Sequence, residues 1–256
     1  MRRKVKAILE VLVFEISFLL LAWYLQASKG SGYGWYSKAI MILLGIVGIF
    51  IHGKLREYGL VPHNFKFSLK WGAYTFLVFS LTSLAAIVVS NSMGILRKVN
   101  PHLLLIDVIW FFIFVGFAEE LFFRGYIQSR LNEVFTRKYE KILGIEFKWS
   151  QGTLITGIFF FGLPHLLVAV NPFTGQVTLT PLILIITLFA CFIGVILGVI
   201  RERTGDIILP TLIHGLIDFT TFGLGRFTGL MISNIATMIA LFIFFLTLFE
   251  KILLSK

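Results

Sequence analysis

Hydrophobic residues dominate this chain in long runs that are separated by short polar segments. Eight runs approach the roughly 20 residues that a helix needs to cross a bilayer. They are Val5–Leu25, Ala39–Ile51, Trp71–Val89, Leu103–Phe123, Leu154–Val170, Leu182–Ile200, Ile207–Phe222 and Leu230–Leu248. The pattern predicts an all-α protein, a polytopic membrane helix bundle with about eight transmembrane helices. No intervening stretch is long enough for a soluble core, so we predict one integral membrane domain over residues 1–256.

The composition agrees with this class. Of the 256 residues, 57% are hydrophobic and only 14% are charged, whereas about half of a soluble domain is apolar. The first run follows the basic start "MRRKVK" and could be a signal peptide, but Glu10 and Glu15 inside it argue against a cleaved segment. Cys191 is the single cysteine, which excludes a disulfide framework and indicates a packing role.

Basic residues predict the orientation, because cytoplasmic loops accumulate lysine and arginine. With the N-terminus inside, most of the 23 lysines and arginines, Lys256 included, fall on the cytoplasmic side, whereas Lys38 falls on the other side. Both termini are therefore predicted to be cytoplasmic. This topology and contact with anionic head groups of the lipid bilayer account for the net charge of +10. No folded basic surface is predicted, so we expect no nucleic-acid partner.

The stretch "GFAEELFFRG" places three ionisable residues inside the fourth apolar run. An ionisable residue at membrane depth costs about 3 kcal/mol on insertion scales, so such residues indicate a functional site. Glu120 and Arg124 are four residues apart and can form an ion pair on one helix face. Glu119 lies about 100° around the helix, so we expect it to be the carboxylate without that partner. An unpaired carboxylate in apolar surroundings is suited to act as a general base. The alternative is that all three residues only hold helices together.

Two further runs contain histidines. "FFFGLPHLL" places His165 directly after Pro164, which is expected to kink or open the helix. "PTLIHGLIDFTTF" places His214 and Asp218 four apart, hence on one helix face. Each histidine alone is more often an interhelical hydrogen-bonding residue than a catalytic one.

The predicted span ends place these polar groups at overlapping depths. At 1.5 Å per residue, Glu119 lies roughly 6 Å, His214 roughly 10 Å and His165 roughly 17 Å from the cytoplasmic edge. An acid and two imidazoles from three helices are therefore expected to converge on one pocket, as in a catalytic site.

These residues carry a resemblance to a known family. "EELFFR", "FGLPH" and "HGLID", in this order on separate helices, resemble the three motifs of the CAAX protease and bacteriocin-processing family of intramembrane proteases, which includes the Ras-converting CAAX endopeptidases. "RERTGDIILPTLIHGLIDF" resembles the lead into the last motif. The resemblance covers roughly Leu103–Phe222, the predicted core of the domain over residues 103–222.

The resemblance implies a role for each motif residue. Glu119 would activate the hydrolytic water and His165 would help to hold it, while Glu120, Arg124 and Phe161 would support the site. His214 and Asp218 would stabilise the oxyanion. Many family members have asparagine where this chain has Asp218, and a carboxylate donates no hydrogen bond unless it is protonated. We therefore assign the donor role to His214, with Asp218 fixing its tautomer.

Metal dependence is a separate question. A glutamate and two histidines could hold zinc with a water as the fourth ligand. The chain has no HExxH spacing, and a ligating Glu119 could not easily serve as the base as well. We expect no metal and no other cofactor.

The charged stretch Ser129–Gly152 links two of the runs. We expect a solvated linking helix there. The alternatives are an amphipathic segment on the membrane surface or an element that admits a substrate tail.

The predicted function is that of an intramembrane endopeptidase acting on a membrane-associated peptide or protein, with a prenylated CAAX-type substrate as one candidate. The alternative is a non-proteolytic scaffold or bacteriocin-immunity protein with the same fold. A transporter is disfavoured because no two-half repeat of interrupted spans is present. The short termini and the lack of organelle signals favour a prokaryotic plasma membrane, with the endoplasmic reticulum expected for a eukaryotic source.

Overall fold

The computed structural model describes residues 2–29 and 34–255, and Lys256 lies outside them. Helices account for 78% of the protein, which confirms the all-α class. Seven helical segments are long and apolar enough to cross a membrane. They are Trp35–His52, Phe65–Ser92, Pro101–Asn132, Gln151–Ala169, Pro181–Thr204, Ile208–Thr228 and Leu230–Leu254. Each contains one of the predicted spans or nearly all of it. The first predicted span lies within α1 (Arg2–Lys29), which is not among these seven, and its crossing of the membrane stays a prediction.

The chain divides into two compact units, each made from two separate chain segments. Unit 1 comprises residues 1–63 and 118–207, and unit 2 comprises residues 64–117 and 208–256.

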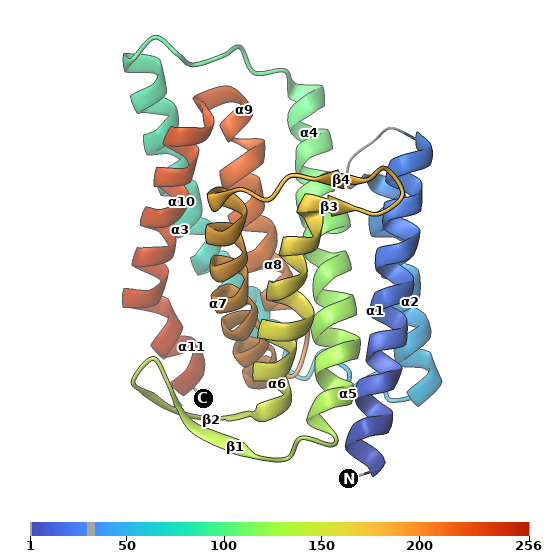
Figure 1. The fold of residues 1–256 in the computed structure, drawn as a ribbon. Helices are drawn as coiled ribbons and strands as arrows, with labels where there is room; N and C mark the ends of the chain where they lie inside the picture. Colours follow the sequence, from blue (N-terminus) through green and yellow to red (C-terminus); the bar gives the residue numbers. More distant parts are fainter. Residues whose placement is uncertain (1, 30–33, 256) are drawn as a thin grey trace. The chain divides into compact units, whose positions relative to one another are not determined.

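In unit 1, α1 runs away from the N-terminus and α2 (Trp35–His52) returns beside it (Figure 1). Next come a π-helix η2 (Glu120–Gln128) and α5 (Ser129–Asn132), then β1 (Lys138–Ile142) and β2 (Ile145–Ser150). The unit continues with α6 (Gln151–Ile155), the π-helix η3 (Thr156–Gly162), the 3₁₀-helix η4 (Leu163–Ala169), β3 (Val170–Asn171), β4 (Gln176–Val177) and α7 (Pro181–Thr204).

In unit 2, α3 (Phe65–Ser92) packs against both α8 (Ile208–Asp218) and α10 (Leu230–Phe244). The remaining elements are α4 (Pro101–Ile109), the π-helices η1 (Trp110–Phe117), η5 (Phe219–Gly223) and η6 (Phe245–Phe249), α9 (Gly225–Thr228) and α11 (Glu250–Leu254).

The linker after α5 is a β-hairpin, so the predicted linking helix is wrong. β1 and β2 pair antiparallel, from Lys138 opposite Ser150 to Ile142 opposite Ile145. The turn residues Leu143 and Gly144 both have positive φ, at 50° and 85°, as a two-residue hairpin turn of the primed type requires. This local turn, together with the side chain of Tyr139 packed on that of Trp149, outweighs the helix-forming charged residues of the segment.

The carboxylate of Glu202 near the end of α7 anchors this hairpin. It accepts hydrogen bonds from the backbone N–H and the hydroxyl of Ser150, at 2.9 and 2.8 Å, and from the hydroxyl of Thr153. Lys138 lies 3.5 Å from the same carboxylate. The end of α7 therefore fixes the start of α6, the first part of the segment that leads to His165.

Glu10 connects α1 to the end of the motif helix, the helical segment Pro101–Asn132 that carries the first motif. It accepts hydrogen bonds from Tyr126 Oη at 3.1 Å and Arg130 Nε at 2.9 Å, and its carboxylate lies 2.6 Å from His52 Nε2. Nearby, Tyr58 donates to Glu133 at 3.3 Å, and burial together with the Glu133 charge raises the pKa of Tyr58 above its usual value. This polar network connects α1, α2 and the end of the motif helix to one another.

A close approach between η3 and α7 requires glycine. A Cβ on Gly162 would lie 2.5 Å from Cys191 Cα and 2.7 Å from its backbone nitrogen, distances at which the backbone must shift. We expect Gly162→Ala to lower the free energy of unfolding by about 1–3 kcal/mol, as overpacking typically does. Thermal unfolding of the purified protein in detergent measures this loss.

Gly125→Ala is the matched control for this prediction. Its Cβ would meet only the flexible end of Ile49 at 3.3 Å and other atoms from 3.5 Å outward. We expect its stability to be close to that of the wild type. A Gly162→Ala protein as stable as the wild type would show that the two helices separate easily, against this account of their packing.

Candidate active site

Glu119 lies in the last helical turn before η2, a nine-residue π-helix that carries the rest of the first motif. Its backbone is helical, with φ −71° and ψ −43°. Long π-helical stretches are rare, and single π turns are frequent at functional sites. The motif therefore sits on an unusual backbone, which changes how its side chains are spaced around the helix.

Glu120 and Arg124 form the predicted ion pair. Arg124 Nη1 lies 3.0 Å from Glu120 Oε1, and neither side chain is exposed to any extent. The four-residue spacing that predicted the pair holds even though the segment is π-helical. A fully buried charge pair is costly to break, because either member alone is left as an uncompensated charge.

Arg124 also ties its helix to two others. Its Nη2 donates a hydrogen bond to the Gly194 carbonyl of α7 at 3.2 Å, and its guanidinium carbon lies 3.9 Å from the centroid of the Phe161 ring in η3. A guanidinium over an aromatic face gains from the cation–π interaction. Arg124 and Phe161 therefore have the supporting geometry that the sequence predicted for them.

Glu119 contacts Lys38, and here the sequence-based expectation is wrong. The carboxylate oxygen Oε1 of Glu119 forms an ion pair with Lys38 Nζ, and the two side chains are only 12% and 8% exposed. We had expected Glu119 to lack a cationic partner. Lys38 was predicted to lie in a non-cytoplasmic loop because the second predicted span begins at Ala39, whereas α2 begins at Trp35 and places Lys38 in its first turn.

His165 is placed by a change of helix type. The π-helix η3 gives way to the 3₁₀-helix η4 at Leu163, next to Pro164, so the predicted irregularity at the proline is present. His165 Nδ1 lies 2.8 Å from the Phe161 carbonyl oxygen. If Nδ1 carries the proton and donates to that carbonyl, Nε2 is left as an acceptor for a water. The His165 ring also packs edge-on against the Phe161 ring, with centroids 5.2 Å apart.

His214 and Asp218 meet on one face of α8 in unit 2, as their spacing predicted. His214 Nε2 lies 3.4 Å from Asp218 Oδ2, and the two side chains are 8% and 19% exposed. A protonated imidazole would form an ion pair at this distance. Asp218 thus has the contact that an orienting role requires.

Unit 1 gathers five of the seven predicted site residues, namely Glu119, Glu120, Arg124, Phe161 and His165, while unit 2 holds His214 and Asp218. Within unit 1, Phe161 connects the first two motifs, because Arg124 lies over its ring and His165 packs against that ring. The sequence analysis placed Lys38 on the non-cytoplasmic side and did not assign it to the site. The only signal for it was a single basic residue directly before an apolar run in "WYSKAIMILLG".

The motif helix is longer than predicted. Its apolar run was taken to end at Phe123, but the helical segment continues to Asn132. Asn132 comes 13 residues after Glu119, so Glu119 lies about three helical turns from this end rather than close to it. The extension contains residues such as Tyr126, Gln128 and Ser129 that are polar but fully or almost fully buried, which the hydropathy pattern alone did not reveal.

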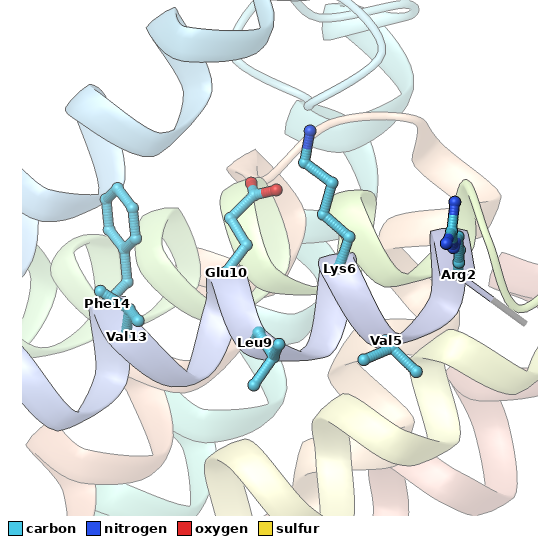
Figure 2. A pocket seen from close by; sticks show the side chains of 7 residues that line it. All are labelled: Arg2, Val5, Lys6, Leu9, Glu10, Val13 and Phe14. Atoms are coloured by element: carbon cyan, nitrogen blue, oxygen red, sulfur yellow. The ribbon is translucent and has the colours of Figure 1, made fainter.

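The residues that the structure describes contain no group of three or more His, Cys, Asp or Glu side chains arranged to share a metal ion. Metal independence stays a prediction, which a chelator tests directly. A shallow hollow elsewhere in unit 1 is lined by α1 alone, and Figure 2 shows Val5 and Leu9 on one side of that helix and Lys6 and Glu10 on the other. It contains no motif residue.

The helical architecture and the buried charged residues define an integral membrane protein with a polar site on its helices. Residues 101–220 match the family described as type II CAAX prenyl endopeptidase Rce1-like. This segment contains all three motifs. This match supports the assignment to the CAAX protease family that the motifs predicted. Searches of curated proteins and of solved structures found no match. The family supports CAAX-type intramembrane endopeptidase activity and a membrane-associated protein or peptide as substrate.

Proposed function

We propose that this protein hydrolyses a peptide bond of a membrane-associated, CAAX-type substrate with a water molecule that Glu119 activates. The observation that carries the proposal is the arrangement of the first motif. A glutamate held next to a lysine adjoins a fully buried Glu120–Arg124 pair that fixes its helix. The family match over residues 101–220 supports the same reaction class.

In the proposed reaction the Glu119 carboxylate accepts a proton from water while the water oxygen attacks the scissile carbonyl carbon. A C–O bond forms and the carbonyl π electrons move to oxygen, which becomes an oxyanion. The oxyanion then collapses, the C–N bond breaks, and the proton held by Glu119 passes to the departing amine. General base catalysis of this kind contributes about 10²–10⁴-fold to the rate.

We assign two histidines to the water and the oxyanion. His165, with Nδ1 directed at the Phe161 carbonyl oxygen, would accept a hydrogen bond from the attacking water at Nε2. His214, oriented by Asp218, would donate to the oxyanion from its other ring nitrogen. If Glu119 and His214 act on the same substrate, we expect the rate loss of the double variant Glu119→Gln/His214→Ala to be smaller than the product of the two single losses. Independent losses would place the two residues in separate roles.

The test is cleavage of a peptide panel by purified, detergent-solubilised protein, with products identified by mass spectrometry. The panel contains a farnesylated CAAX peptide, the same peptide without the farnesyl group, and a peptide whose CAAX cysteine is replaced by serine. Cleavage behind the cysteine by the wild type but not by Glu119→Gln supports the proposal. Failure of the wild type to cut any of these peptides would favour the scaffold or immunity function instead.

Chelation should leave the activity intact. Because the proposed mechanism uses a glutamate and no metal, we expect cleavage rates with and without excess EDTA or 1,10-phenanthroline to agree within about twofold. Loss of activity that added zinc restores would contradict this expectation and make Glu119 or a histidine a ligand.

The location in a prokaryotic plasma membrane remains a prediction to be tested by fractionation of the source cells.

A further inference from the structure

Lys38 occupies a position that the proposed chemistry does not yet explain. It lies in the first turn of α2, follows the N-cap residue Gly34, and has a side chain that is only 8% exposed. Lysine is almost never fully buried unless it is paired. Its partner is Glu119, the residue that we assign as the general base, which comes from a different helix 81 residues later in the chain.

The charge state of Glu119 decides whether it can act. A general base must be deprotonated before it accepts a proton from water. Apolar surroundings favour the neutral form of a carboxyl group, whereas a cation within about 4–6 Å favours the charged form. Lys38 is placed to supply this cation.

We propose that Lys38 is a positioning residue that keeps the Glu119 carboxylate ionised and directed while it serves as the base. This inference rests on the proposed function, since it assigns Glu119 the role of base. The ammonium contacts one carboxylate oxygen, Oε1, and this contact fixes the rotation of the carboxyl group. Lys38 touches no reacting atom in this scheme and acts only through Glu119.

Other charged groups cannot replace Lys38 in this role. The guanidinium of Arg124 interacts electrostatically with Glu119, but it makes its ion pair with Glu120 at 3.0 Å. The cations at the end of the same helix and on α7, Arg130 and Arg201, contact other groups, a carboxylate at 2.9 Å and a hydroxyl at 2.7 Å. Glu15 on α1 is an acid and supplies no positive charge.

The first test measures the charge of Glu119 without any need for proteolysis. Infrared spectra recorded across a pH series report the protonated carboxyl band, and its absence from Glu119→Gln assigns the band to Glu119. We expect the midpoint of this titration to lie about 1–3 pH units higher in Lys38→Met than in the wild type. Lys38→Arg, which keeps the charge, should titrate close to the wild type.

The second test follows kcat/KM over the same pH range. The acid limb of the profile should move upward in Lys38→Met by the same amount as the infrared midpoint. On the acid side of the limb, cleavage should fall about tenfold for each pH unit of displacement and recover in more alkaline buffer, as the population of the deprotonated base requires. A purely structural role would lower the rate at every pH without displacing the limb.

The matched control is Lys54→Met. Lys54 pairs with Glu133 at 2.9 Å and is half exposed, so its loss should leave the Glu119 midpoint unchanged. If Lys38→Met does not fold, Lys38→Gln replaces it, because its amide still forms hydrogen bonds but carries no charge. Equal midpoints in the wild type and the uncharged variant overturn the proposal, as does a Lys38→Arg midpoint displaced as far as that of Lys38→Met. The infrared result remains readable if no peptide is cleaved, so failure of the proposed function is distinguished from failure of this inference.

Discussion

Glu119→Gln is expected to lower the rate of peptide cleavage by about 10²–10⁴-fold, the contribution of a positioned general base. Glutamine has nearly the same shape as glutamate but cannot accept a proton from water. The rate is measured as initial product formation from the best substrate of the peptide panel. Because binding of the substrate does not require the base, we expect the loss in kcat rather than in KM.

The contact with Lys38 complicates this variant and dictates its controls. Glu119→Gln removes the negative charge that faces the Lys38 ammonium, and this loss destabilises the protein. Thermal unfolding is therefore measured for every variant whose cleavage rate is measured. The double variant Lys38→Met/Glu119→Gln tests whether removal of both charges restores stability. Glu146→Gln is the matched carboxylate control, since Glu146 is exposed on the hairpin. Cleavage at the wild-type rate by a folded Glu119→Gln protein would exclude Glu119 as the base.

Arg124→Met is expected to lower the free energy of unfolding by about 3–5 kcal/mol, the usual result of breaking a buried ion pair from one side. The substitution leaves the Glu120 carboxylate without its guanidinium and removes the hydrogen bond to the Gly194 carbonyl. It also removes the cation from the face of the Phe161 ring. Chemical unfolding in mixed micelles or thermal unfolding in detergent measures the loss.

Removal of both charges separates the ion pair from the other contacts. Glu120→Gln/Arg124→Met should recover part of the stability that Arg124→Met loses, because no uncompensated charge remains. Lys141→Met, whose exposed pair with Glu146 lies on the hairpin, should be nearly neutral. Wild-type stability of Arg124→Met would show that Arg124 does not support the motif helix.

The helices themselves could be predicted well from the sequence, because burial in lipid demands long apolar runs whatever the tertiary contacts. The ion pair of Glu120 with Arg124 and the break at Pro164 followed from spacing and from proline geometry, which are local. The hairpin was missed because its evidence lies in a two-residue turn at Leu143–Gly144, while the charged residues around it suit either structure.

The site was predictable where its residues share a helix and not where they come from different helices. Lys38 and Glu119 lie 81 residues apart, and no periodicity relates them. The Gly194 carbonyl that accepts from Arg124 is a backbone group, for which the residue type carries no signal. The π-helical winding of η2 likewise escaped a reading based on 100° per residue.

The separation between Lys38 and Glu119 also has a consequence for biosynthesis. At about 5–20 residues per second, the ribosome adds Glu119 about 4–16 s after Lys38. During that interval the nascent α2 carries an ammonium whose carboxylate does not yet exist, and a lysine at the centre of a bilayer costs about 3 kcal/mol. Because Lys38 lies in the first turn of α2, its side chain can extend to the head-group region until Glu119 has been synthesised. The ion pair therefore cannot form until the helix that carries Glu119 has been synthesised, two helices after α2.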